Sequence, residues 1–105
     1  MCYKSHIVQM GHLEYFCNMS NLTITFLGTG TSQGIPVIGS DPPVSLSKDA
    51  KYKRLRSSVK ITWKDFVYVI DCGPDFRQQM LNTSTDKLNG ILFTHYHADH
   101  TAGLD

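Results

Sequence analysis

Three histidines and an aspartate lie within six residues near the C-terminal end of the chain, at His95, His97, Asp99 and His100. Neutral imidazole is the commonest side-chain metal ligand, and an ionised carboxylate adds a hard oxygen donor. His95 and His97 are two residues apart, so both can point the same way in an extended loop. Asp99 and His100 are adjacent and can reach a second point nearby. The spacing therefore predicts two metal ions that lie close together.

The cluster directly follows a short apolar run, Ile91 to Phe93. Such a run predicts a buried strand, with the polar cluster on the loop at its C-terminal end. Open α/β structures place their chemistry at that end of the strand. A single histidine is more often an ordinary surface or core residue than a ligand. Four potential ligands directly after an apolar strand favour a metal site.

Other elements must position this loop. Alternation of apolar and polar residues predicts strands at 22–27 and 59–63, and an apolar run predicts a third strand at 66–70 that is buried on both faces. A helix is expected over 74–81, since proline suits a first helical turn. Its buried stripe is expected to consist of Phe76, Met80 and Leu81. The glycine loop 28–34 favours a tight turn over a nucleotide site.

The pattern His-x-His-x-Asp-His at 95–100 resembles the metal motif of the metallo-β-lactamase-fold hydrolases. Within that superfamily, 26–32 together with 34–36 is similar to the branch of ribonuclease Z and the phosphoribosyl cyclic phosphate phosphodiesterases, most of all to the latter. The resemblance covers 22–105 and implies an α/β (α+β) fold. We expect the N-terminal half of an αββα sandwich, with a mixed sheet and a helix packed on one face. Residues 1–21 are expected to be a disordered N-terminal extension.

The resemblance also implies an activity. It predicts a metallo-hydrolase that cleaves a cyclic or other small phosphodiester through a metal-bound hydroxide. His95 and His97 would hold the first of two divalent ions, zinc or manganese, and Asp99 and His100 would hold the second. Asp99 would act as the catalytic residue that orients the nucleophile. Asp71, at the end of a strand, would lie behind the histidines and orient them. A cap on a helix or turn is the alternative role of Asp71.

Two further segments bear on the substrate. Four cations lie within 51–56, and Arg54 and Arg56 could contact a phosphate, although a solvated surface is an equal alternative. Relatives in the phosphodiesterase branch often carry three zinc-binding cysteines after Gly-Ile-Pro. The matching positions here are Ser40, Pro42 and Ser45, so we expect no structural zinc in that loop.

Length and composition set the remaining expectations. The chain has 105 residues and a net charge of +1, which makes nucleic acid a less expected partner than a small phosphodiester. Three scattered cysteines favour a reducing, cytoplasmic location, and no run is long enough to span a membrane. The later metal ligands of the superfamily have no counterpart in the chain. The alternatives are therefore a ribonuclease Z-like RNA phosphodiesterase, or a truncated, inactive fragment that binds metal weakly and pairs as a homodimer.

Overall fold

The structure is a computed structural model that describes residues 2–8, 12–17, 21–40, 48 and 52–104, with the backbone alone in the first two ranges. Pro42 and Ser45, at two of the three positions where relatives carry cysteines, lie outside the described residues. Among the described residues, no helix is both long and apolar enough to cross a bilayer. The expected cytoplasmic location stays a prediction.

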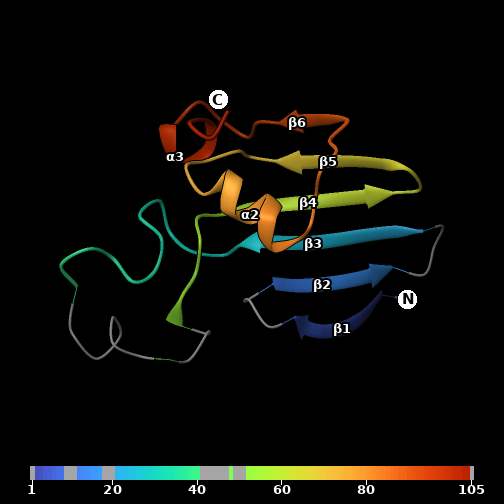
Figure 1. Cartoon of the computed structure of the whole chain (residues 1–105), viewed down its shortest axis with the longest axis horizontal. Coiled ribbons are helices and arrows are strands. Elements are labelled where there is room, and N and C mark those ends of the chain that lie inside the picture. The colour runs from blue at the N-terminus through green and yellow to red at the C-terminus, as the bar shows by residue number, and fades with distance from the viewer. Residues whose placement is uncertain (1, 9–11, 18–20, 41–47, 49–51, 105) are drawn as a thin grey trace.

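A mixed sheet of six strands forms the body of the chain (Figure 1). In sequence and in space its order is β1 (Cys2–Val8), β2 (His12–Cys17), β3 (Leu22–Gly28), β4 (Ser58–Trp63), β5 (Phe66–Ile70) and β6 (Gly90–Leu92). Neighbouring strands are antiparallel except β5 and β6, which are parallel. The helix α2 (Phe76–Asn82) connects that parallel pair, and α3 (Ala98–Thr101) follows β6. The predicted mixed sheet with a helix on one face is confirmed.

The strands β1 and β2 were not predicted from the sequence. The backbone of β1 pairs with β2, and β2 pairs with β3, so both strands extend the sheet on the side away from β6. Residues 1–21 were expected to be a disordered extension, so regular structure was not predicted there. The domain boundary between residues 21 and 22 stays a prediction.

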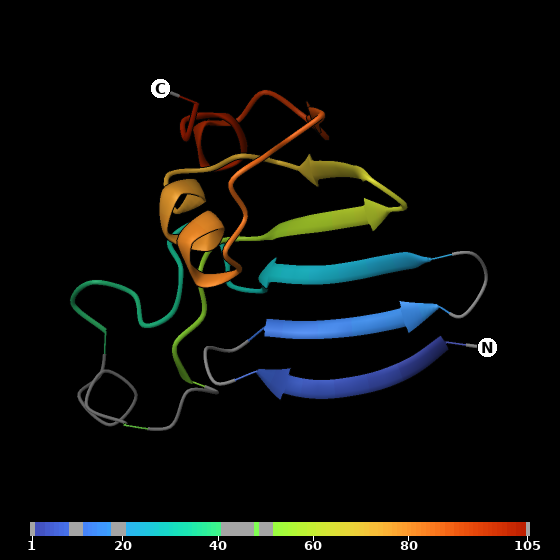
Figure 2. The ribbon, with the colours of Figure 1, turned by 45° about the vertical axis from the view of Figure 1, so that its right-hand side comes forward.

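The helix α2 covers only one face of the sheet (Figure 2). Thr25, Lys60 and Val69 are neighbours across three strands and therefore share a face. The Lys60 ammonium donates a hydrogen bond to Thr85, just beyond α2, which identifies this face as the covered one. Thr25, Leu27 and Val69, which are buried, lie on it. The apolar core is therefore small.

Two predictions that apolar residues would be buried were wrong. Within β5 only Val69 is fully buried, while Phe66 is 46% exposed because its face is not covered by α2. In the run Ile91–Phe93, the strand β6 ends at Leu92, which is 56% exposed, and Phe93 is also exposed. This strand lies at the edge of the sheet, where apolar residues have fewer neighbours. Pairing of two copies through such exposed apolar side chains stays a prediction.

The buried residue of α2 is also different from the one predicted. Gln79 is 1% exposed, whereas Leu81 is exposed and Phe76 and Met80 are only partly covered. The Gln79 amide nitrogen donates to the Arg56 carbonyl oxygen at 2.9 Å, so a polar contact seats the helix on the chain before β4. Because Gln79 and Arg56 are far apart in the sequence, the spacing of apolar residues along the helix could not predict this contact.

The glycine loop after β3 is a tight turn, as predicted. Gly34 has a φ of +74° and its amide donates to the Thr31 carbonyl at 2.9 Å. At Gly28 an added Cβ would lie 2.0 Å from the Arg56 carbonyl oxygen, so the absence of a side chain lets two backbone segments touch. The loop is thereby fixed against the segment that leads into β4.

Candidate metal centre

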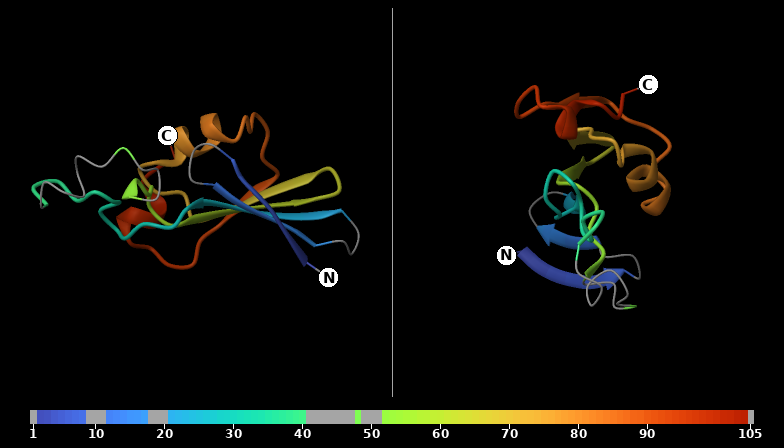
Figure 3. Two further views of the ribbon diagram at one scale, coloured as in Figure 1. Left: turned by 90° about the horizontal axis from the view of Figure 1, so that it is seen from below. Right: turned by 90° about the vertical axis from the view of Figure 1, so that its left-hand side faces the viewer.

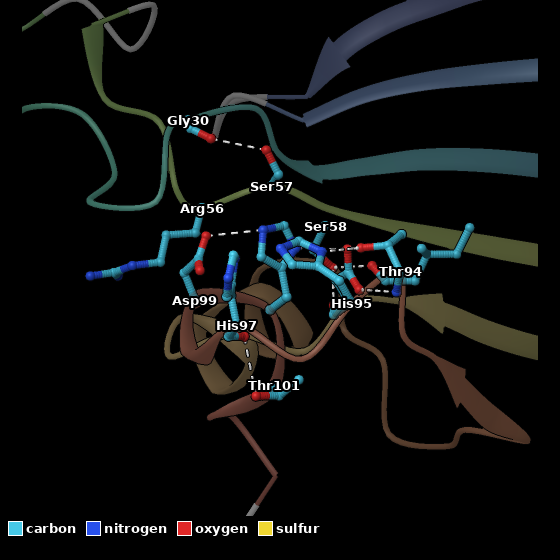
Figure 4. Close-up of polar contacts among 12 residues, drawn as sticks. Gly30, Arg56, Ser57, Ser58, Thr94, His95, His97, Asp99 and Thr101 are labelled. Carbon is cyan, nitrogen blue, oxygen red and sulfur yellow. Dashed lines mark hydrogen bonds and ion pairs between the residues drawn. The ribbon is translucent and has the colours of Figure 1, made fainter.

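His95, His97 and Asp99 lie near one another between β6 and α3 (Figure 4), and the fourth predicted ligand, His100, is a neighbour of His95. His95 and His97 lie on the connecting loop, and Asp99 and His100 lie within α3. The ring centroids of His95 and His97 are 4.7 Å apart, and those of His95 and His100 are 4.0 Å apart. His97 has extended backbone angles, as an extended loop requires. Both views of Figure 3 place this loop on the side of the sheet opposite α2.

Asp71 lies directly behind this cluster. Its φ of +62° is in the left-handed region, which turns the chain sharply at the end of β5. One carboxylate oxygen accepts from the Thr94 amide at 2.8 Å. The other accepts from the Thr94 hydroxyl at 2.7 Å and contacts His100 Nδ1 at 2.8 Å. The residue before α2 is Asp75, not Asp71, so the helix-capping alternative does not describe Asp71.

Two opposing effects act on the Asp71 carboxyl, which is 5% exposed. Burial raises its pKa, because a charge is less stable away from water. Hydrogen bonds from the Thr94 side chain, the Thr94 amide and His100 outweigh burial, so the pKa lies below its ordinary value of 3.8. Asp71 is therefore an anion at neutral pH, and it can only accept hydrogen bonds.

Backbone contacts hold α3 against the end of β5. The Cys72 amide donates to the His100 carbonyl at 2.7 Å, and the Gly103 amide donates to the Cys72 carbonyl at 2.9 Å. A Cβ at Gly73 would lie 2.0 Å from the Asp99 carbonyl oxygen. Cys72 itself is fully buried, as predicted, and burial raises the pKa of its thiol. The positions of Asp99 and His100 are thus fixed by main-chain packing.

The donor set suits a divalent ion in chemical type, since imidazole and carboxylate are ligands of zinc and manganese. Asp99 Oδ2 lies 3.0 Å from His100 Nε2, so these two ligand atoms are neighbours. Within the described part of the chain, no three His, Cys, Asp or Glu side chains converge closely enough to enclose an ion. The residues present therefore fit part of a coordination shell.

The two predicted phosphate contacts are not brought into the cluster. The Arg56 guanidinium pairs with Asp75 at 2.9 Å and donates to the Ser32 carbonyl at 2.8 Å, and Figure 4 shows its side chain pointing away from the histidines. Arg54 lines a pocket with Lys53, Thr29 and other residues, and none of the described histidines belongs to that lining. A phosphate contact by either arginine stays a prediction.

Thr94 was not predicted from the sequence, and its side chain links Asp71 to the histidine loop. Its hydroxyl oxygen lies 2.9 Å from His95 Nδ1 in addition to its bond with Asp71. Ser58 was also missed, and its hydroxyl donates to the Asp71 carbonyl at 2.8 Å. The available signal for Thr94 was a hydroxyl residue immediately before the first histidine of the motif.

Comparison with known proteins gives several related matches. Residues 67–105 match the family model described as a β-lactamase superfamily domain. The chain is 48% identical over 80 residues to an octanoyltransferase of Porphyromonas gingivalis, which covers 75% of this chain and 16% of that protein. It is 33% identical over 85 residues to ribonuclease Z of Methanococcus maripaludis, which covers 79% of this chain and 22% of that protein. The chain thus spans less than a quarter of these relatives.

Solved structures share its architecture. A new diphosphatase from the PhnP family superimposes with a TM-score of 0.75 at 44% identity, over 79% of this chain and 33% of that one. Zinc-bound PqqB from Methylobacterium extorquens gives a TM-score of 0.67 at 20% identity, over 76% of this chain and 31% of that one, which shows the fold alone. With the family match, the shared fold and the histidine motif in agreement, the chain belongs to the metallo-β-lactamase superfamily.

Proposed function

We propose that the protein is a metal-dependent phosphodiesterase that hydrolyses a cyclic or other small phosphodiester. The observation that carries the proposal is that the His95 ring lies next to the rings of His97 and His100, and that Asp99 and the buried Asp71 both contact His100. The 44% identity to a PhnP-family diphosphatase supports phosphate chemistry. The match to the octanoyltransferase covers 16% of that protein, so it gives no support for acyl transfer.

Each side chain has a role in this proposal. His95 and His97 would hold one divalent ion, and Asp99 and His100 would hold another. Divalent ions in such sites activate water and offset negative charge on phosphoryl oxygens. Asp99 would orient the attacking water, because its carboxylate is partly exposed and can accept a hydrogen bond. Asp71 would keep the His100 ring in place during the reaction, through the bond to Nδ1.

Ribonuclease Z-like cleavage of RNA is the second candidate. Ribonucleases Z of archaea match most of this chain at roughly 30–35% identity, for example at 33% and 34%. Binding to the nucleic acid backbone relies on clustered cations, and four lie within 51–56, so charge does not separate the two candidates. The 44% identity to the PhnP-family diphosphatase, against 33% and 34% to these ribonucleases Z, favours the small phosphodiester.

A substrate panel tests the proposal on the whole protein of which these residues are a part. We expect zinc- or manganese-dependent hydrolysis of bis(p-nitrophenyl) phosphate and of a ribose cyclic phosphate, with loss of turnover in the His95→Ala/His97→Ala variant. Arg77→Ala, at an exposed position of α2, serves as the matched control. Turnover of precursor tRNA alone would favour the second candidate. Metal-independent turnover, or none on any phosphodiester, would overturn the proposal.

Residues 1–105 alone are expected to hydrolyse phosphodiesters poorly. Catalytic zinc usually has three protein ligands and a water, whereas His95 and His97 supply two. The described residues do not bring a third donor into one enclosing group. Metal-dependent turnover by this chain that disappears in the His95→Ala/His97→Ala variant would show that these ligands suffice.

A further inference from the structure

The Thr94 hydroxyl lies between a carboxylate and a ligand histidine. Its oxygen is 2.7 Å from Asp71 Oδ2 and 2.9 Å from His95 Nδ1. Both distances are those of good hydrogen bonds. A threonine hydroxyl has only one hydrogen to donate, so it can donate to one of these partners and must accept from the other.

The two partners are not equivalent. The other oxygen of the Asp71 carboxylate already accepts the Thr94 amide at 2.8 Å, and a carboxylate can only accept. If the hydroxyl hydrogen pointed at His95, two oxygen lone pairs would face each other at 2.7 Å across the Asp71 contact. The arrangement that makes both contacts favourable has Thr94 donating to Asp71. His95 Nδ1 must then carry a hydrogen and donate it to Thr94.

We propose that Thr94 is a positioning residue that fixes His95 in its Nδ1-protonated tautomer, which leaves the Nε2 lone pair available as a metal ligand. This inference rests on the proposed function only in assigning that ligand a catalytic use. Asp71 also contacts His100 directly, since Nδ1 lies 2.8 Å from Oδ2, while the other ring nitrogen lies 3.0 Å from Asp99 Oδ2. One buried carboxylate thus contacts two ligand rings, one of them through Thr94.

A purely structural role for Thr94 predicts a different outcome. The Thr94 amide also donates to Asp71 Oδ1 at 2.8 Å, and this bond ties the loop to β5 without the hydroxyl. Thr94→Val keeps the amide and nearly the same shape but removes the hydroxyl. Thr94→Ser keeps the hydroxyl. The pair of variants therefore separates loop attachment from control of the His95 ring.

The primary measurement is long-range ¹H–¹⁵N NMR of the metal-free chain with ¹⁵N-labelled histidine. The pH should be about two units above the ordinary histidine pKa of ~6.5, so that the rings are neutral. We expect His95 to carry its hydrogen on Nδ1 in the wild type and in Thr94→Ser. In Thr94→Val the hydrogen should move to Nε2, while the His100 signals, which depend on Asp71 and Asp99 and not on Thr94, should stay unchanged as an internal reference.

Zinc affinity provides the second readout, by competition with a coloured chelator. Loss of a group that orients a ligand typically weakens metal binding roughly 10- to 100-fold, and we expect this for Thr94→Val but not for Thr94→Ser. A wild-type His95 with its hydrogen on Nε2 would overturn the inference even if Thr94→Val failed to fold. So would an unchanged tautomer in a folded Thr94→Val chain. A failed phosphodiester panel would remove the proposed function but would leave the tautomer result standing.

Discussion

Replacement of Asp71 by asparagine should destabilise the chain by removing the anion behind the histidines. Asparagine accepts the left-handed φ of +62° as readily as aspartate, so the backbone should keep its course. The carboxylate accepts from three donors in the wild type, two on one oxygen and one on the other. An amide offers one oxygen and one NH₂ group in their place. At least one donor, on Thr94 or on His100, must therefore face another donor.

The magnitude follows from those contacts. A hydrogen bond to a charged group contributes about 1.5–3 kcal/mol, so the loss of one or two such bonds brackets the effect. Thr94 is exposed and His100 is partly exposed, so water can replace some of what is lost. We expect a loss of about 2–4 kcal/mol in the free energy of unfolding. That is a large part of the ~5–15 kcal/mol typical of a whole domain.

Urea denaturation at neutral pH measures this loss, with Asp65→Asn in the exposed β4–β5 turn as the matched control. The pH dependence gives an independent check. The folded pKa of Asp71 lies below 3.8, so its stabilising contribution is fully present above pH 3.8 and is lost as the pH falls through the lowered value. The difference between wild type and Asp71→Asn should shrink over that acid range. Equal unfolding midpoints for the Asp71 and Asp65 variants at neutral pH would refute the reasoning.

Three further predictions concern the same centre. Gly73→Ala should shift α3 and cost several kcal/mol, since its Cβ would lie 2.0 Å from the Asp99 carbonyl oxygen; an unchanged melting temperature would contradict this. Cys72 should react far more slowly with iodoacetamide in the folded than in the urea-unfolded chain, as peptide mass spectrometry can measure, because burial raises its thiol pKa. His95→Ala/His97→Ala should lose most bound zinc by elemental mass spectrometry, and undiminished content would disprove the ligand assignment.

Local patterns predicted the elements whose contacts are local in sequence. Alternation at 22–27 and at 59–63 predicted β3 and β4, and its paired apolar residues Ile24 and Ile61, with Phe26 and Val59, share the sheet face away from α2. The ligand cluster was equally accessible, since its four members lie within six residues. Asp71 could be proposed because it ends an apolar strand.

Features that depend on distant neighbours were missed. The burial of Gln79 results from the Arg56 carbonyl, and the exposure of Leu92 results from the edge position of β6. Neither fact is encoded in the residues next to it. Thr94 was missed for a different reason. Its hydroxyl connects His95 to Asp71, and this role is visible only when the position of Asp71 behind the histidines is known.

Asp71 connects three parts of the chain around the ligand cluster. The Asp71 amide donates to the Leu92 carbonyl, which joins the ends of β5 and β6. The Asp71 carboxylate contacts Thr94 and His100. The hydrogen bonds that hold the rings are therefore made by protein groups alone. A site prepared in this way loses less side-chain freedom when it binds a metal. Removing Asp71 should then weaken metal binding even though this carboxylate lies behind the ligands, because it acts on both His95 and His100.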